Sequence, residues 1–180
     1  AHMMERYFTN SRNVETTDRI IEATMKTIIN NVPKFLANPK NYDAAAEIMW
    51  SGTLAHNNIM STGRMGDWAS HNIEHELSGI YDVAHGAGLA TVFPAWMKYV
   101  LHHDVTRFAQ YAERVWNVDV NHWNQEETAL EGIRRQVEFY RFVGLPVTLK
   151  ELGAGEDRLV EMADKATAGD THTLGQFVEL

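Results

Sequence analysis

Apolar residues recur at helical spacing along nearly the whole chain, and this periodicity constrains the fold more than any other feature. The clearest stripe runs from Ile20 to Leu36, with apolar residues three or four positions apart, and predicts a helix of about five turns. The sequence has no alternating strand pattern between turn dipeptides and no glycine-rich phosphate loop. We therefore predict an all-α fold of about seven helices.

Capping and helix-breaking residues suggest where the other helices begin and end. One begins after Asn41, which can cap it, and runs to about Met60, before a break at Ser61–Gly66. Another begins at Asp67, a candidate N-cap, and loosens between Gly79 and Val83. The remaining predicted segments are His85 to Leu101 with a bend at Pro94, Val105 to Trp116, Glu126 to Phe142, a capped turn at Thr148–Glu151, and Asp157 to Lys165.

Composition excludes several classes of function. The chain has 24 acidic and 16 basic residues, a net charge of −8, so it has no field that attracts nucleic acid or an anionic membrane. No apolar run approaches the ~20 residues of a membrane span, and no export signal is visible, so we expect a soluble, cytoplasmic protein. Because the chain has no cysteine, any metal must be held by histidine and carboxylate.

A group of three histidines carries the functional argument. His71 and His75 are four residues apart, so they share one face of the predicted helix. In an unbroken helix His71 and His85 would lie ~21 Å apart, too far for one ion. A common site therefore requires a turn between Gly79 and Ala84, and Gly86 would leave room for a ligand beside His85.

The residues alone leave three interpretations open. The segment His71-Asn-Ile-Glu74-His75 fits the H-x-x-E-H pattern of a zinc metalloprotease, with Glu74 as general base and Glu151 as a third ligand. The histidines can equally be structural, in a helical module without chemistry. A metal site that uses His85 is the third interpretation.

The run from Gly66 to Tyr99 closely resembles the metal-binding segment of the iron-containing (group III) alcohol dehydrogenases, and most of all their butanol dehydrogenase and aldehyde reductase branch. Ala1–Phe8, Ile48–Ala55 and Tyr111–Trp116 resemble other stretches of the same C-terminal domain. The resemblance implies that residues 1–180 are a helical metal-binding domain. It also implies that the NAD(P)H-binding N-terminal α/β domain is absent from this sequence. The helical pattern is already running at Ala1 and apolar residues still recur at Leu180, so we expect the domain to be truncated at both ends.

The resemblance also implies a ligand set of one aspartate and three histidines. Carried over, His2, His71 and His85 are the metal ligands, the aspartate falls just before residue 1, and the metal is Fe²⁺ or Zn²⁺. His75 matches the family's additional histidine beside nicotinamide and substrate, a catalytic residue rather than a ligand. Glu74 is then structural, paired with a nearby Arg or Lys.

The implied activity is alcohol oxidation or aldehyde reduction with NAD(P)H on a small alcohol or aldehyde. We expect this fragment to be inactive alone and its parent to be a homo-oligomer. Three aromatic residues either line a substrate pocket or, as helical spacing favours, belong to the core: Trp68, Phe93 and Trp96. The remaining histidines are expected at the surface or in local hydrogen bonds: His56, His102, His103, His122 and His172.

Overall fold

A computed structural model describes residues 1–180 and contains α-helices without any β-strand. The predicted all-α fold is confirmed. The helices are α1 (His2–Tyr7), α2 (Glu15–Ala37), α3 (Tyr42–His56), α4 (Ala69–Tyr81), α5 (His85–Val100), α6 (Val105–Trp116), α7 (Gln125–Phe142), α8 (Leu149–Leu152) and α9 (Leu159–Ala166). None of them is long and apolar enough to cross a membrane.

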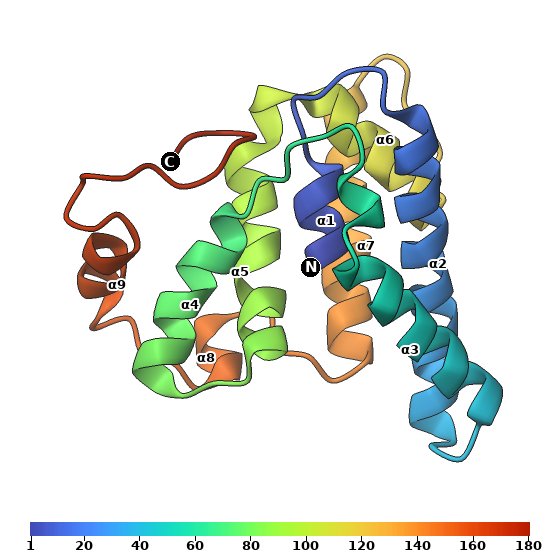
Figure 1. The fold of residues 1–180 in the computed structure, drawn as a ribbon, viewed down its shortest axis with the longest axis horizontal. Helices are drawn as coiled ribbons and strands as arrows, with labels where there is room; N and C mark the ends of the chain where they lie inside the picture. The colour runs from blue at the N-terminus through green and yellow to red at the C-terminus, as the bar shows by residue number, and fades with distance from the viewer.

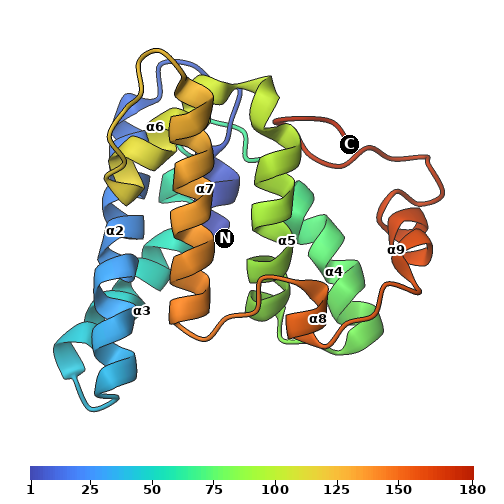
Figure 2. The ribbon, with the colours of Figure 1, turned by 180° about the vertical axis from the view of Figure 1, so that it is seen from behind.

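Three helical pairs surround the short helix α1. The pairs α2 with α3, α4 with α5, and α6 with α7 each pack against one another, and the N-terminus lies in the middle of the molecule (Figure 1). Seen from behind, α7 and α5 flank the N-terminus, while α9 and the C-terminal segment lie at the outer edge (Figure 2). The first residues of the chain are therefore placed where elements from all three pairs meet.

Most predicted boundaries are confirmed, and two need correction. Helix α3 ends at His56 rather than near Met60, because Asn58 takes a left-handed conformation with φ of 67°. Helix α4 begins at Ala69 with Trp68, not Asp67, in the N-cap position. The Asp67 carboxylate still accepts a hydrogen bond from the Ala69 N–H at 3.1 Å, but the side chain of the N-cap residue itself makes no capping hydrogen bond.

The main core is aromatic and includes the end of α1. Phe8 stacks on Phe108 with ring centroids 4.4 Å apart and also contacts Phe93 and Trp96. Phe93 and Trp96 are thus core residues, as their spacing favours. Elsewhere α6 and α7 approach closely at Gly132, which has no side chain; a Cβ there would overlap Ala112.

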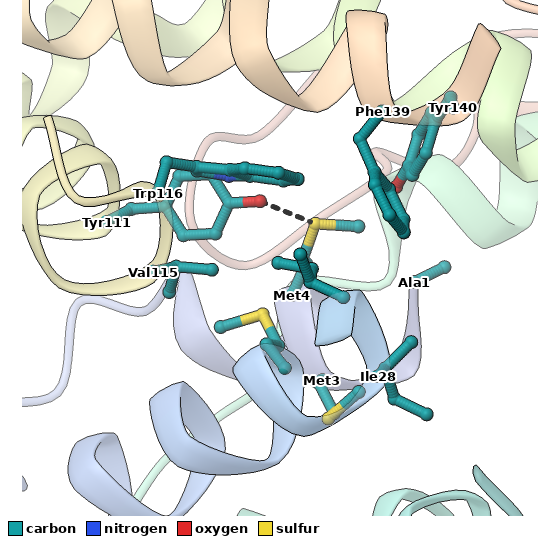
Figure 3. A pocket seen from close by; sticks show the side chains of 11 residues that line it. Ala1, Met3, Met4, Ile28, Tyr111, Val115, Trp116, Phe139 and Tyr140 are labelled. Atoms are coloured by element: carbon teal, nitrogen blue, oxygen red, sulfur yellow. Dashed lines mark hydrogen bonds between the residues drawn. The ribbon is translucent and has the colours of Figure 1, made fainter. Parts of the chain in front are cut away.

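An apolar pocket of about 120 Å³ lies where α1 faces α2, α6 and α7 (Figure 3). All eleven of its lining residues are hydrophobic; the Tyr111 hydroxyl lies 3.4 Å from the Met4 sulfur and donates to Gln136 Oε1 at 2.6 Å. Its lining has no charged or metal-ligating side chain, so the chemistry of the molecule lies elsewhere.

A buried ion-pair network fixes α2 against α6. The carboxylate of Asp18 pairs with Arg64 at 2.8 Å and with Arg107 at 2.5 Å, and Arg107 Nε also donates to the Tyr7 carbonyl at 2.8 Å. Burial acts to raise the pKa of Asp18, but the hydrogen bonds and charges of the two arginines outweigh it and hold that pKa below 3.8. The network joins the end of α1 to the scaffold.

We predict that Asp18→Asn lowers the free energy of unfolding at pH 7 by about 3–5 kcal/mol, because it leaves buried guanidinium groups unpaired. Since the folded-state pKa is depressed, the stabilisation is present above about pH 4 and is lost as the pH falls through the folded pKa. Urea unfolding at pH 7 and at pH 3 measures this. The control is Glu15→Gln on the exposed face of α2, and equal stability of Asp18→Asn and this control at pH 7 would contradict the prediction.

Candidate metal centre

Histidines from four helices converge beside the N-terminus. The ring centroids of His2 and His71 lie 4.6 Å apart, those of His71 and His85 lie 5.4 Å apart, and those of His75 and His85 lie 5.5 Å apart. All four histidines singled out in the sequence are therefore brought together. His56, at the end of α3, joins them with its ring 4.2 Å from that of His2.

The turn between α4 and α5 makes this convergence possible. Helix α4 ends at Tyr81, Asp82 adopts a left-handed conformation with φ of 50°, and α5 begins at His85. The predicted reversal between Gly79 and Ala84 is confirmed. The chain folds back so that His85 faces His71 across the α4–α5 pair.

Glu5 of α1 holds the start of α4. Its carboxylate is fully buried and accepts three hydrogen bonds: from the Trp68 N–H at 2.9 Å, the His71 N–H at 3.1 Å and His71 Nδ1 at 2.7 Å. The first-turn N–H groups of a helix lack partners within it, so Glu5 caps α4 from another helix. With Nδ1 donating to Glu5, the Nε2 atom of His71 is buried and has no hydrogen-bond partner.

Glu74 of α4 holds His85 of α5 in the same way. Its fully buried carboxylate accepts hydrogen bonds from Ser78 Oγ and from His85 Nδ1. The expected pairing of Glu74 with an arginine or lysine is therefore wrong, because the neighbouring helix presents His85 to this carboxylate instead. Gly88 faces this carboxylate so closely that a Cβ there would overlap it, whereas a Cβ at Gly86 would meet open space.

His2 is half-buried at the edge of the cluster, beside the buried His71. Burial, followed by the neighbouring rings of His71 and His56, lowers the pKa of His2 to about 4. His2 is therefore neutral at pH 7, the form that binds a metal. His56 is exposed, as predicted, and its Nδ1 bonds the Gly52 carbonyl at 2.7 Å.

One group of three side chains has its ligand atoms close enough together to hold a cation, and a second group, of three histidine rings, lies beside it without meeting that distance. Ligand atoms of Glu74, His75 and His85 lie within 4.8 Å of one another, but Glu74 already uses one oxygen for Ser78 and the other for His85. The second group, His2, His71 and His85, includes the unpartnered Nε2 of His71. Imidazole nitrogens suit Fe²⁺ and Zn²⁺ alike, so this second donor set fits a divalent transition metal.

A cavity of about 350 Å³ opens beside this cluster. It is bounded by the histidines His2, His56 and His85, and its other walls are formed by Ala1, Gly86, Leu89, Ala90, Tyr140 and Leu145. A larger cavity, about 610 Å³, separates α9 from α4 and α5, and it is lined by hydrophobic residues and two threonines only. Of these two cavities, the one of about 350 Å³ combines apolar walls with histidine side chains that can bind a metal.

The structure does not assemble the metalloprotease constellation. Glu151 is exposed, accepts hydrogen bonds from the Val147 N–H at 2.8 Å and from Arg141 at 3.4 Å, and shares no group of ligand atoms with His71 or His75. Both oxygens of the fully buried Glu74 carboxylate already accept a hydrogen bond, from Ser78 and from His85. The remaining histidines are exposed as predicted: His102, His103, His122 and His172.

Sequence reasoning missed two residues at this site. His56 carries no local signal, because it approaches His2 through the packing of α3 against α1. Glu5 did carry one: His2-Met-Met-Glu5 repeats the spacing of His71-Asn-Ile-Glu74. Trp68 lies beside this cluster, with its ring 5.1 Å from that of His71, unlike the two other aromatic candidates in the core.

We predict that Gly88→Ala lowers the melting temperature by several degrees, because the new methyl group displaces the buried Glu74 carboxylate at a cost of about 1–3 kcal/mol. Gly86→Ala on the same helix is the matched control, since its methyl group meets open space. Circular dichroism melts compare the two variants. A Gly88→Ala variant as stable as Gly86→Ala would show that the close approach is not needed.

Comparison with known protein families gives one match over the whole chain. Residues 1–180 match the family described as Fe-containing alcohol dehydrogenase family, C-terminal. The chain is 39% identical over 180 residues to the probable NADH-dependent butanol dehydrogenase 1 of Bacillus subtilis, covering 100% of this chain and 46% of that protein. It is 31% identical over 175 residues to an NADPH-dependent aldehyde reductase of Escherichia coli, covering 97% of this chain and 45% of that protein.

Solved structures agree with these sequence matches. The NADH-dependent butanol dehydrogenase A of Thermotoga maritima superposes with a TM-score of 0.91 at 37% identity, covering 99% of this chain and 46% of that one. The substrate-free and cofactor-free aldehyde reductase of Escherichia coli superposes with a TM-score of 0.90 at 31% identity, covering 97% and 45%. The chain thus spans about half the length of the relatives it matches.

Proposed function

Because this chain belongs to the Fe-containing alcohol dehydrogenase family, we propose that its 180 residues form the helical metal-binding domain of an NAD(P)H-dependent alcohol dehydrogenase or aldehyde reductase. The relatives at 39% and 31% identity are named a butanol dehydrogenase and an aldehyde reductase. One observation of this structure carries the proposal. His71 Nε2 is buried without a hydrogen-bond partner among the rings of neighbouring histidines, an arrangement that a bound cation satisfies.

In this proposal His2, His71 and His85 hold Fe²⁺ or Zn²⁺, and an aspartate preceding residue 1 completes the set. The resemblance described above supplies the aspartate, and the convergence of the three rings supports the histidines. When bound, the metal supplies Lewis acidity toward an alcohol or carbonyl oxygen. The carboxylates of Glu5 and Glu74 remain hydrogen-bonded to ligand imidazoles rather than to the metal.

His75 then carries the proton of the reaction. Its side chain is exposed, and its ring lies 5.5 Å from that of His85 and 6.3 Å from that of His71. During oxidation the alcohol carbon gives a hydride to C4 of the nicotinamide, and a ring nitrogen of His75 passes the hydroxyl proton to solvent. Reduction returns one hydride and one proton to the aldehyde.

The cavity supports a small apolar substrate. Leucine, alanine and Tyr140 side chains line the cavity together with three histidines, so it offers apolar surface to an aliphatic chain and imidazoles to an oxygen. Burial raises the pKa of Tyr140 above its ordinary range, so its hydroxyl stays protonated and does not act as a base at pH 7. The nicotinamide cofactor binds mainly to a nucleotide domain outside these residues, and this chain alone is inactive in our proposal.

We predict that His71→Ala or His85→Ala in the full-length enzyme abolishes metal binding, because each removes a ligand. His75→Ala retains the metal and lowers turnover, by about 10²–10⁴-fold if the proton step is rate-limiting. Metal analysis by inductively coupled plasma mass spectrometry and NAD(P)H-linked assays with 1-butanol and butanal measure both effects. Equal metal loss in all three variants would refute the assignment of roles.

The same full-length enzyme separates the alternative functions. Turnover that disappears with a chelator and returns with Fe²⁺ or Zn²⁺ supports the oxidoreductase. Chelator-sensitive peptide cleavage without alcohol turnover supports the metalloprotease, and neither activity with any metal or nucleotide supports a structural module.

A further inference from the structure

The centre is built from a repeated turn of helix that has a histidine followed three residues later by a glutamate. Resting on the proposed function, we propose that Glu5 of α1 and Glu74 of α4 are positioning residues: they hold the ligand histidines of α4 and α5, respectively, in a single tautomer and orientation. Neither glutamate touches the metal or substrate in this scheme. The pair makes the ligand geometry a property of how α1, α4 and α5 pack together.

The repeat is visible in the sequence and in space. His2-Met-Met-Glu5 lies on α1 and His71-Asn-Ile-Glu74 lies on α4. Residues three apart share a helix face, so each turn presents an imidazole and a carboxylate on the same side. The imidazole joins the histidine cluster, and the carboxylate contacts a histidine of another helix: Glu5 of α1 contacts His71 of α4, and Glu74 of α4 contacts His85 of α5.

The first pair is fixed by three donors that all belong to the first turn of α4 or precede it directly. The Glu5 oxygens accept the N–H groups of Trp68 and His71 together with His71 Nδ1. A buried carboxylate is costly without such partners, and the positive end of α4 adds to their effect. Because Nδ1 must carry a hydrogen to donate, the neutral His71 ring leaves the lone pair on Nε2, the buried atom that has no partner.

The second pair is fixed by the close packing of α4 on α5. Glu74 is fully buried, its carboxylate lies against Gly88, and Ser78 occupies the oxygen that does not face His85. The remaining oxygen accepts a hydrogen bond from His85 Nδ1. The lone pair of the neutral His85 ring is therefore again on Nε2. The two ligand histidines therefore share one tautomer for two independent structural reasons.

The tautomers are tested in the metal-free chain by long-range ¹⁵N–¹H correlation spectra of ¹⁵N-histidine-labelled protein at pH 8. We expect His71 and His85 to carry hydrogen on Nδ1, while the exposed His122 shows mainly the Nε2–H form of free imidazole. Hydrogen mainly on Nε2 of either His71 or His85 would overturn the proposal. This readout needs no metal, so it holds whether or not the proposed metal centre exists.

Metal affinity gives the second test. We expect Glu74→Gln to weaken Zn²⁺ binding by about 10–100-fold in a competition assay with a chromogenic chelator, because the neutral amide keeps the bond to Ser78 but loses the charge facing His85. Glu76→Gln removes a charge from the same helix outside the cluster, and this variant should bind Zn²⁺ as tightly as the unsubstituted protein. Circular dichroism melts establish that both variants fold.

The outcomes separate the two claims. Equal Zn²⁺ affinity of Glu74→Gln and Glu76→Gln would overturn the positioning role of Glu74. Failure of the unsubstituted protein to bind Zn²⁺ would count against the proposed metal centre. The tautomer spectra would still decide the positioning role. Glu5→Gln serves as the corresponding variant for His71, because its amide group must turn toward one of the N–H donors that the carboxylate accepts.

Discussion

The contact between the Glu5 carboxylate and the first turn of α4 is the interaction on which the site depends. It joins the N-terminal helix to α4 and orients His71. It also caps α4, whose N-cap residue, Trp68, makes no side-chain hydrogen bond to the helix. Without it a buried negative charge and several buried N–H groups would lack partners, each at a cost of about 1–3 kcal/mol or more. One side chain thus couples the folding of the N-terminal helix to the geometry of the histidine cluster.

The rest of the molecule keeps α1 where this contact requires it. Phe8 anchors the end of α1 in the aromatic core, and Arg107 holds the Tyr7 carbonyl while pairing with Asp18. On the other side, Arg6 donates to the Ala55 carbonyl at 3.0 Å and to Ser61 Oγ at 2.7 Å, and it lies over the Trp68 ring. Polar and apolar contacts from three helical pairs therefore hold a helix of only six residues, which would not be stable alone.

Local pattern was sufficient to predict the elements but not the partners of the buried charges. Helical periodicity and caps predicted α6 residue for residue and placed the reversal before His85, because both depend on neighbouring residues. The partners of Glu74 and Glu5 are set by packing between helices. Spacing suggested a general base for Glu74, the family resemblance suggested an Arg or Lys partner for it, and neither gave a role to Glu5. The same reason explains why Gly88 rather than Gly86 proved to be the glycine in close contact. Spacing likewise paired His71 with His75, whereas the structure shows His85 nearer to His71 than His75 is.

In our proposal, imidazoles from α1, α4 and α5 bind one cation, and the carboxylates of Glu5 and Glu74 hydrogen-bond two of these imidazoles without binding the cation. The most direct measurement is anomalous diffraction at the metal edge from crystals of the metal-loaded protein. The account predicts one peak bonded to the Nε2 atoms of His2, His71 and His85 at about 2.0–2.1 Å, with Glu5 and Glu74 outside the ligand sphere. A peak bonded to the Glu74 carboxylate together with His75 and His85 would contradict it.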